Sequence, residues 1–149
     1  GIIVEGLSNC LVKFSKCCSP VPGDDIVGFI TRGYGVSVHR ADCPNVLRSR
    51  DNPAEAGRWI RVSWADKTSE SYHTMLQVVA KDRISLIVDV STVLSATKTR
   101  VLSLNARSTP DGFALLDLGI EVNGRDQLKT VMSRLEQIQG VMKVTRPAG

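Results

Sequence analysis

The sequence has 149 residues, which is enough for one ordinary domain or two small ones, and its 42% hydrophobic and 23% charged residues are typical of folded globular proteins. Its 19 Lys and Arg against 15 Asp and Glu give a net charge of +4, a mild excess that permits an anionic partner without requiring one. No apolar run approaches the ~18 residues of a membrane span, and the first residues lack the basic start of a signal peptide. These features exclude membrane-spanning and disordered classes and predict a cytoplasmic protein with no membrane partner.

Short strands are predicted for the first part of the chain. Four runs have the length and alternation of apolar residues that strands show, and we expect them to form one small sheet: 11–14, 26–31, 36–39 and 59–64. Asp42 is expected to cap a short helix that opens with Cys43 and Pro44 and ends at about Arg48, because proline loses no hydrogen bond at a first helical position.

The cysteines and one histidine of this part have the atom types of a zinc site. Cys17, Cys18, His39 and Cys43 form a CC-x20-H-x3-C pattern. Successive strand residues point to opposite faces, so the adjacent cysteines can reach one ion only if the backbone kinks there. The alternative is that the thiols pack as small apolar groups and that His39 is hydrogen-bonded in the core. Cys10 lies outside the pattern and is expected to be a packed thiol.

Catalytic constellations are incomplete. A thiol nucleophile at Cys17 or Cys18, activated by His39 or His73, would lack an orienting third group and an oxyanion site. The glycines at 33 and 35 lack the third glycine and following helix of a dinucleotide-binding loop. We therefore expect the chain to bind and regulate, with no catalytic residues of its own.

Basic residues gather around the cysteine segment. Together with Tyr34, at a predicted loop tip, they form a candidate surface for phosphate contacts and base stacking on RNA, although a solvated basic face is the alternative. The candidate RNA-binding residues are Lys13, Lys16, Arg32, Tyr34, Arg40 and Arg48.

A polar segment, 66–71, is expected to separate one domain, 1–66, from a second, 72–149. The periodicities of the second domain predict strand, helix, strand, strand, helix and strand, in that order. The segments are 74–80, 86–94, 101–107, 113–122, 128–138 and 141–146, with a Pro-Asp-Gly turn inside 109–112 and Asp82 or Ser85 as the first helix cap. The order βαββαβ packs two helices on one face of a four-stranded sheet. The fold class is thus α+β, with a small mixed cysteine domain before a ferredoxin-like domain.

Two long motifs resemble one known family. The run from Lys16 to Asn45, KCCSPVPGDDIVGFITRGYGVSVHRADCPN, closely resembles the cysteine-containing domain of the RelA/SpoT homologues, the stringent-response (p)ppGpp synthetases and hydrolases. The run DRISLIVDV at 82–90, with the hairpin and helix after it, resembles the ACT domain that ends the same proteins. The family's catalytic domains lie upstream, so the resemblance implies a non-enzymatic regulatory piece of a GTP pyrophosphokinase.

The resemblance also implies partners for the first domain. This zinc-finger or ribosome-intersubunit domain is expected to dock on ribosomal RNA, where a stalled ribosome holds uncharged tRNA, and to signal to the upstream catalytic domains of the same chain. The family's Cys and His positions are all present at Cys17, Cys18, His39 and Cys43, which implies a possible Zn cofactor.

For the second domain, the resemblance implies an alternative function as an amino-acid sensor that acts through ligand-dependent dimerisation. ACT domains commonly pair side by side and often bind amino acids, in some members of this family branched-chain ones. The usual site is the loop before the first helix, where free backbone N–H groups can receive a carboxylate. The family often has Gly at the position of Ser85 and Asn at that of Arg100, and arginine here would either block the site or pair with the ligand. The candidate amino-acid-binding residues are Asp82, Arg83, Ile84, Ser85, Leu86 and Arg100.

Overall fold

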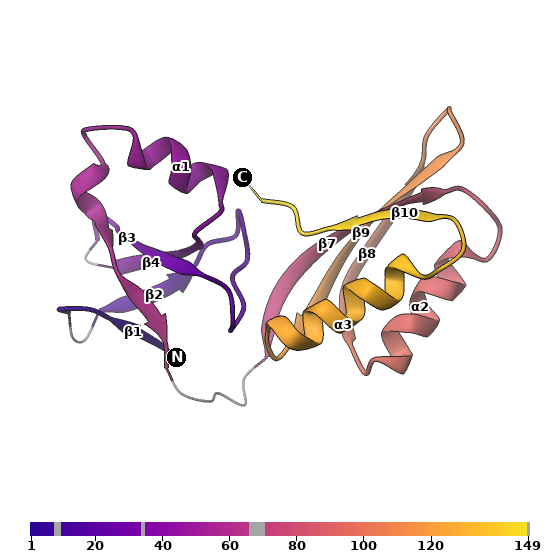
Figure 1. Ribbon diagram of the computed structural model, residues 1–149, viewed down its shortest axis with the longest axis horizontal. Helices are drawn as coiled ribbons and strands as arrows, with labels where there is room; N and C mark the ends of the chain where they lie inside the picture. Colours follow the sequence, from indigo (N-terminus) through magenta and orange to yellow (C-terminus); the bar gives the residue numbers. More distant parts are fainter. Residues whose placement is uncertain (8–9, 34, 66–70, 149) are drawn as a thin grey trace. The chain divides into compact units, whose positions relative to one another are not determined.

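The computed structural model describes residues 1–7, 10–33, 35–65 and 71–148 (Figure 1). The chain divides into two compact units, Gly1–Glu70 with Ala148–Gly149, and Ser71–Pro147. Among the helices of the described ranges, none is long and apolar enough to cross a membrane. Tyr34 and Asp66, the last residue of the expected first domain, lie outside the described residues.

The first unit contains a four-stranded sheet, a separate strand pair and one α-helix. Its elements are β1 (Ile2–Val4), β2 (Leu11–Phe14), β3 (Ile26–Ile30), β4 (Gly35–Arg40), α1 (Pro44–Arg50), a 3₁₀ turn (Ala56–Arg58), β5 (Trp59–Ile60) and β6 (Val62–Trp64). The sheet has the order β2-β4-β3-β5, in which β2 runs parallel to β4 and the other neighbours are antiparallel.

The single strand expected at 59–64 is wrong, because the chain changes partner at Arg61. Strand β5 pairs with β3, whereas β6 pairs with β1, a three-residue strand that the pattern analysis did not identify. Residues 59–64 therefore belong to two sheets, and β6 adds a second layer to the unit.

The sheet of the first unit has one buried face and one partly buried face. Val36 and Val38 of β4 point into a core that also contains Val4 and Val62, and Cys10 packs against this core as a half-buried thiol. Ser37 and His39 alternate with these valines and therefore face the other side. That side carries a second cluster, formed by Cys18, Cys43 and Val46 with Cys17, Val27, Trp59 and Ala148 packed around it.

Helix α1 begins at Pro44, one residue after the predicted start at Cys43, and its cap also differs from the prediction. Cys43 occupies the N-cap position, and no side chain caps the helix. The carboxylate of Asp42 instead accepts hydrogen bonds from the guanidinium of Arg40. Asp42 as the helix cap is therefore wrong, since its side chain is held by the strand that precedes it.

The second unit has the βαββαβ order and the helix placement that the periodicities predict. Its elements are β7 (Tyr72–Lys81), α2 (Leu86–Ala96), β8 (Arg100–Ser108), β9 (Phe113–Val122), α3 (Arg125–Glu136) and β10 (Val141–Thr145). The strands are antiparallel in the order β10-β7-β9-β8, and both helices lie on one face of the sheet (Figure 1). The apolar stripes of α2 and α3 are buried against this face, which makes one core.

Neither Asp82 nor Ser85 caps α2 through its side chain. Ser85 occupies the N-cap position in the left-handed region, with φ +70° and no side-chain cap bond. The carboxylate of Asp82 accepts a hydrogen bond from the hydroxyl of Ser108, at 2.6 Å. Both side chains therefore depart from the predicted capping role.

Candidate functional site

Cys17, Cys18, His39 and Cys43 come together on one face of the first sheet. The two adjacent cysteines lie in a turn directly after β2, His39 lies near the end of β4, and Cys43 precedes α1. The backbone kink that two adjacent ligands require is present: Ser19 has φ +47°, and its N–H donates to the carbonyl of Ser15 at 3.0 Å. The bend lets both thiols turn toward the same point.

The donor atoms lie close enough together to bind one metal ion. Cys17 Sγ lies 3.4 Å from His39 Nδ1 and 3.6 Å from Cys43 Sγ, and Cys18 Sγ lies 3.9 Å from both Cys17 Sγ and His39 Nδ1. All four atoms lie within 4.8 Å of one another. Zn–S and Zn–N bonds of about 2.3 and 2.0 Å give tetrahedral edges of about 3.8 Å for two sulfurs and about 3.6 Å for sulfur and nitrogen. The four separations above are close to these values, and all four donors lie near enough to one another to bind one metal ion, which is consistent with zinc.

Burial sets the protonation of these groups. It raises the pKa of Cys18 to about 12, an effect that Cys17 and Cys43 reinforce and that a backbone hydrogen bond from Arg40 partly offsets. Burial also lowers the pKa of His39, which favours the neutral imidazole that binds metals. Three crowded thiolates repel one another, so a deprotonated cluster requires a cation at its centre.

Arg40 belongs to this cluster and not to the solvent-facing basic surface. Its side chain is only 11% exposed and forms a two-bond ion pair with Asp42. Burial opposes its charge, but the hydrogen bond and charge of Asp42 outweigh that effect and raise the pKa of Arg40. The RNA contact expected for Arg40 stays a prediction, and in this structure three of its donors face protein acceptors.

A basic and aromatic row lies beside the cluster on the same face of the sheet. The strand register places Lys13 of β2, Ser37 of β4 and Phe29 of β3 side by side, with Trp59 of β5 at the end of the row. The guanidinium of Arg58 stacks over the ring of Phe29, 4.6 Å from its centre. Trp59 continues the contact to the cluster, since its ring lies 5.8 Å from that of His39.

Phe29 and Arg58 were missed by sequence reasoning. Phe29 lies two residues after Val27 in a predicted strand, so both side chains are expected on the same face. Its pairing with β5 could not be predicted, because that pairing depends on the division of residues 59–64 into two strands.

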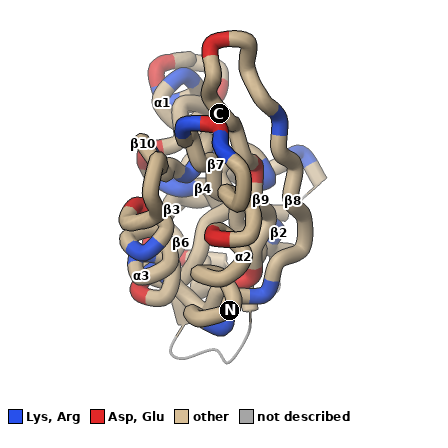
Figure 2. Tube along the Cα trace, turned by 90° about the vertical axis from the view of Figure 1, so that its right-hand side faces the viewer, with Lys and Arg blue, Asp and Glu red and all other residues tan. Residues whose placement is uncertain are grey.

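Of the basic residues that were expected, Lys13, Lys16, Arg32 and Arg48 are exposed, and Arg48 donates to the side chain of Asn45. Both signs of charge are interspersed along the chain (Figure 2).

The second unit has a cavity of about 220 Å³ between the start of α2 and the end of β8. It includes Asp82, Arg83 and Leu86 of the expected amino-acid site. Its remaining lining residues are Ile87, Ala106, Arg107, Ser108, Ala114 and Leu116. Arg83 is already engaged, since it donates to the carbonyls of Gln139 and Ile84 and to the carboxylate of Asp89.

Ile84, Ser85 and Arg100 do not line this cavity. Ile84 is 92% exposed, and Arg100 lies at the opposite end of β8 from Arg107, roughly 20 Å away at the usual rise of a strand. Arg107 takes the place expected for Arg100 as the basic residue that lines the cavity. The sequence could not distinguish these two arginines without the start and register of β8.

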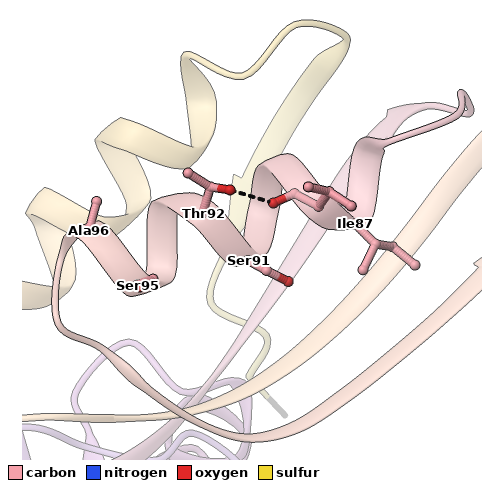
Figure 3. A pocket seen from close by; sticks show the side chains of 6 residues that line it. Ile87, Ser91, Thr92, Ser95 and Ala96 are labelled. Carbon is pink, nitrogen blue, oxygen red and sulfur yellow. Dashed lines mark hydrogen bonds between the residues drawn. The ribbon is translucent and has the colours of Figure 1, made fainter.

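The outward side of α2 presents apolar and small polar side chains, and the edge strand β8 carries Arg100 near its start and Arg107 near its end. Figure 3 shows an open hollow on α2 that is lined by Ile87, Val88, Ser91, Thr92, Ser95 and Ala96. All residues of the edge strand β8 are exposed, including Val101, Leu102 and Leu104. The outward side of α3, by contrast, is charged, with exposed Arg125, Asp126, Lys129, Arg134 and Glu136.

Comparison with known families assigns both units. Residues 2–65 match the RelA/SpoT RIS domain, and residues 68–146 match the ACT domain. The chain belongs to the ACT domain family. Its ACT domain follows a RIS domain, so the chain corresponds to the C-terminal regulatory region of RelA/SpoT proteins.

Relatives carry this RIS–ACT region within longer proteins. The GTP pyrophosphokinase of Escherichia coli is 38% identical over 149 residues, which are 99% of this chain and 20% of that protein. The bifunctional (p)ppGpp synthase/hydrolase RelA of Mycobacterium tuberculosis is 38% identical over 146 residues, 98% of this chain and 19% of that protein. The chain thus spans about a fifth of these relatives. The solved ACT domain from the GTP pyrophosphokinase of Chlorobium tepidum is 26% identical over 52% of this chain and 99% of that chain, with a TM-score of 0.47.

Proposed function

We propose that this chain is the regulatory module of a stringent-response (p)ppGpp synthetase/hydrolase in the cytoplasm. Its cysteine domain, 1–66, binds ribosomal RNA near uncharged tRNA, and together with the ACT domain, 72–149, it passes the starvation signal to catalytic domains upstream in the same chain. The observation that carries this proposal is the succession of RIS and ACT domains, since relatives with the same succession are GTP pyrophosphokinases about five times as long.

The row beside the cysteine cluster supports the RNA contact. Lys13 can neutralise a phosphate, and Phe29 with Arg58 offers a stacked cationic and aromatic surface of the kind that unpaired bases use. Lys16 and Arg32 extend the positive charge on exposed positions.

The RNA proposal is tested by charge reversal. The triple variant Lys13→Glu, Lys16→Glu and Arg32→Glu should bind ribosomes at least about tenfold more weakly at moderate salt, with a smaller dependence of affinity on salt concentration. Reversal of the exposed residues Lys129 and Arg134 on α3 is the matched control. Unchanged co-sedimentation with ribosomes over a salt series would refute the RNA contact.

We infer that the four converging Cys and His side chains hold a structural Zn²⁺ ion. When bound, the metal supplies a cross-link between the turn after β2 and the segment from β4 to α1. Metal analysis of protein purified without chelator or metal-affinity tag should give about one zinc per chain. Less than about half an equivalent would favour packed thiols.

A second candidate function is amino-acid sensing by the ACT domain. The cavity beside α2 combines apolar walls from Leu86, Ile87 and Leu116 with one guanidinium, Arg107, which suits a branched-chain amino acid with a free carboxylate. Calorimetry with valine and isoleucine should give saturable heat that Arg107→Ala removes and Arg100→Ala retains. No heat with either amino acid would eliminate this function.

A homodimer through the ACT domain would link such a ligand to regulation. The hollow on α2 and the exposed edge strand β8 support this interface, because an edge strand offers unpaired backbone groups and the hollow is lined by apolar and small polar side chains. Ser91→Arg should convert dimer to monomer in sedimentation equilibrium, with and without valine, whereas Ser133→Arg on α3 should not. A wild-type chain that stays monomeric at about 100 μM would exclude a stable dimer.

A further inference from the structure

Two of the four candidate zinc ligands, His39 and Cys43, come from one short segment, and an ion pair between two other residues of that segment stabilises its conformation. Between His39 and Cys43 lie Arg40 and Asp42, whose side chains pair through two bonds: Arg40 Nε to Asp42 Oδ1 at 3.0 Å and Nη2 to Oδ2 at 2.8 Å. Paired bonds fix orientation as well as distance, since the guanidinium and the carboxylate are both planar. The pair therefore fixes the bend that separates the two ligands.

Arg40 also reaches the other half of the ligand set. Its backbone N–H donates to Cys18 Sγ at 3.3 Å, and its Nη1 donates to the carbonyl of Cys18 at 3.4 Å. An N–H donor at a metal-bound sulfur reduces the negative charge that the sulfur presents and orients its lone pairs. One residue thus connects the Cys17–Cys18 turn to the His39–Cys43 segment.

The burial of Arg40 suits a role in orienting the metal ligands better than a role in binding a partner at the surface. Its side chain is 11% exposed, whereas that of its partner Asp42 is 70% exposed, so the guanidinium is enclosed and the carboxylate covers it from the solvent side. An enclosed guanidinium is costly unless its hydrogen bonds are satisfied, and three of the donors of Arg40 are satisfied here.

We propose that Arg40 is a positioning residue of the metal centre: it holds the two ligand pairs at tetrahedral separation and does not serve the basic surface around it. This inference rests on the zinc proposal and extends it to the residues outside the ligand set. It assigns different roles to two arginines eight positions apart, because Arg48 is an exposed residue of α1.

Cobalt titration of the whole 149-residue chain under reducing conditions tests this role. Co²⁺ replaces zinc in tetrahedral thiolate sites and gives visible absorption bands that depend on ligand geometry. Arg40→Met should weaken Co²⁺ binding about 10- to 100-fold, the usual cost of losing a group that orients metal ligands. Arg40→Lys keeps the charge without the planar fork and should be intermediate. Arg48→Met removes the same charge from an exposed position and should leave the affinity unchanged.

Two further comparisons distinguish a positioning role of Arg40 from a role in folding and from the zinc proposal. Asp42→Asn keeps the packing of Arg40 but weakens its pair, so it should lower Co²⁺ affinity severalfold while the fluorescence of the folded chain is unchanged. Affinities of Arg40→Met and Asp42→Asn within twofold of wild type, with unshifted absorption bands, would overturn the positioning role alone. A wild-type chain without cobalt bands would overturn both the zinc site and this role.

Discussion

The cysteines of this chain differ more clearly in the residues that surround them than in their spacing along the sequence. Cys17, Cys18 and Cys43 share their face of the sheet with His39, whereas Cys10 packs against the valine core on the other face. The first three can act as ligands to one ion, and Cys10 has no such neighbours among the described residues.

Replacement of single cysteines should reveal this division. Cys43→Ser removes a donor from a buried tetrahedral set, so zinc content should fall from about one equivalent to near zero. Cys10→Ser should retain the metal and lose only a modest part of the packing energy, about 1 kcal/mol. Metal analysis and urea unfolding of the two variants provide the comparison, and equal zinc content in both would contradict it.

Gly28 marks a position in the first sheet where no side chain fits. A Cβ atom there would lie 2.7 Å from Val62 Cγ1 and 2.8 Å from Val36 Cγ1, well inside normal contact. Gly28→Ala should therefore lower the free energy of unfolding by about 1–3 kcal/mol, as overpacked cores do. Gly57→Ala, which has open space around it, is the control for urea unfolding and should change stability by less than about 0.5 kcal/mol.

At the scale of elements, the start of α2 carries conformational strain. Ser85 has φ +70°, a region that costs a residue with a side chain about 1 kcal/mol, and no side-chain cap bond offsets the cost. Ser85→Gly should raise the free energy of unfolding by about 0.5–1 kcal/mol. Ser91→Gly, in the interior of the same helix, should lower it by a similar amount. Thermal unfolding of both variants should give shifts of opposite sign; a loss of stability in both would show that Ser85 is not strained.

Helices and strands with a regular apolar periodicity could be predicted from the sequence. Strands whose bounds depend on the strand that they pair with could not. The alternation in β7 and the apolar stripes of α2 and α3 are local signals, and they gave the βαββαβ order of the second unit correctly. The division of residues 59–64 depends on which strand lies opposite each half, and no local pattern records that. Asp42 has the composition of a helix cap, but the arginine two residues earlier competes for its carboxylate.

The same distinction applies to the candidate sites. The ligand types at Cys17, Cys18, His39 and Cys43 were evident from the sequence, while their convergence depends on the bend at Ser19. The RNA role predicted for Arg40 rests on charge alone, and a sequence does not show that a guanidinium is 11% exposed. The amino-acid role predicted for Arg100 rests on the family resemblance, whereas the arginine that lines the cavity is Arg107, which the register of β8 and β9 places there.

At the scale of the whole chain, metal binding should raise the free energy of unfolding of the first unit. Both tryptophans, Trp59 and Trp64, lie in this unit, and Trp59 packs against the cysteine cluster. A ligand that binds only the folded state stabilises it by about 4 kcal/mol at a thousand times its Kd, so chelation should lower the unfolding midpoint that tryptophan fluorescence reports.

Cys43→Ser is the internal reference for the chelation experiment. Its midpoint should already be low and should not move when chelator is added, because the site is incomplete. An equal response of wild type and Cys43→Ser to chelator would mean that the chelator acts elsewhere.

The parallel pairing of β2 with β4 also determines at which step of folding the metal site becomes complete. Strands β3 and β4 are neighbours in sequence and can form a hairpin early, whereas β2 joins β4 through residues such as Leu11 and Gly35 that are 24 positions apart. The turn that holds Cys17 and Cys18 follows β2, so half of the donors arrive only with this late, non-local step. We therefore expect the complete ligand set to form only after β2 has paired with β4, and a chain that has not reached that step exposes the thiols of Cys17, Cys18 and Cys43 to oxidants.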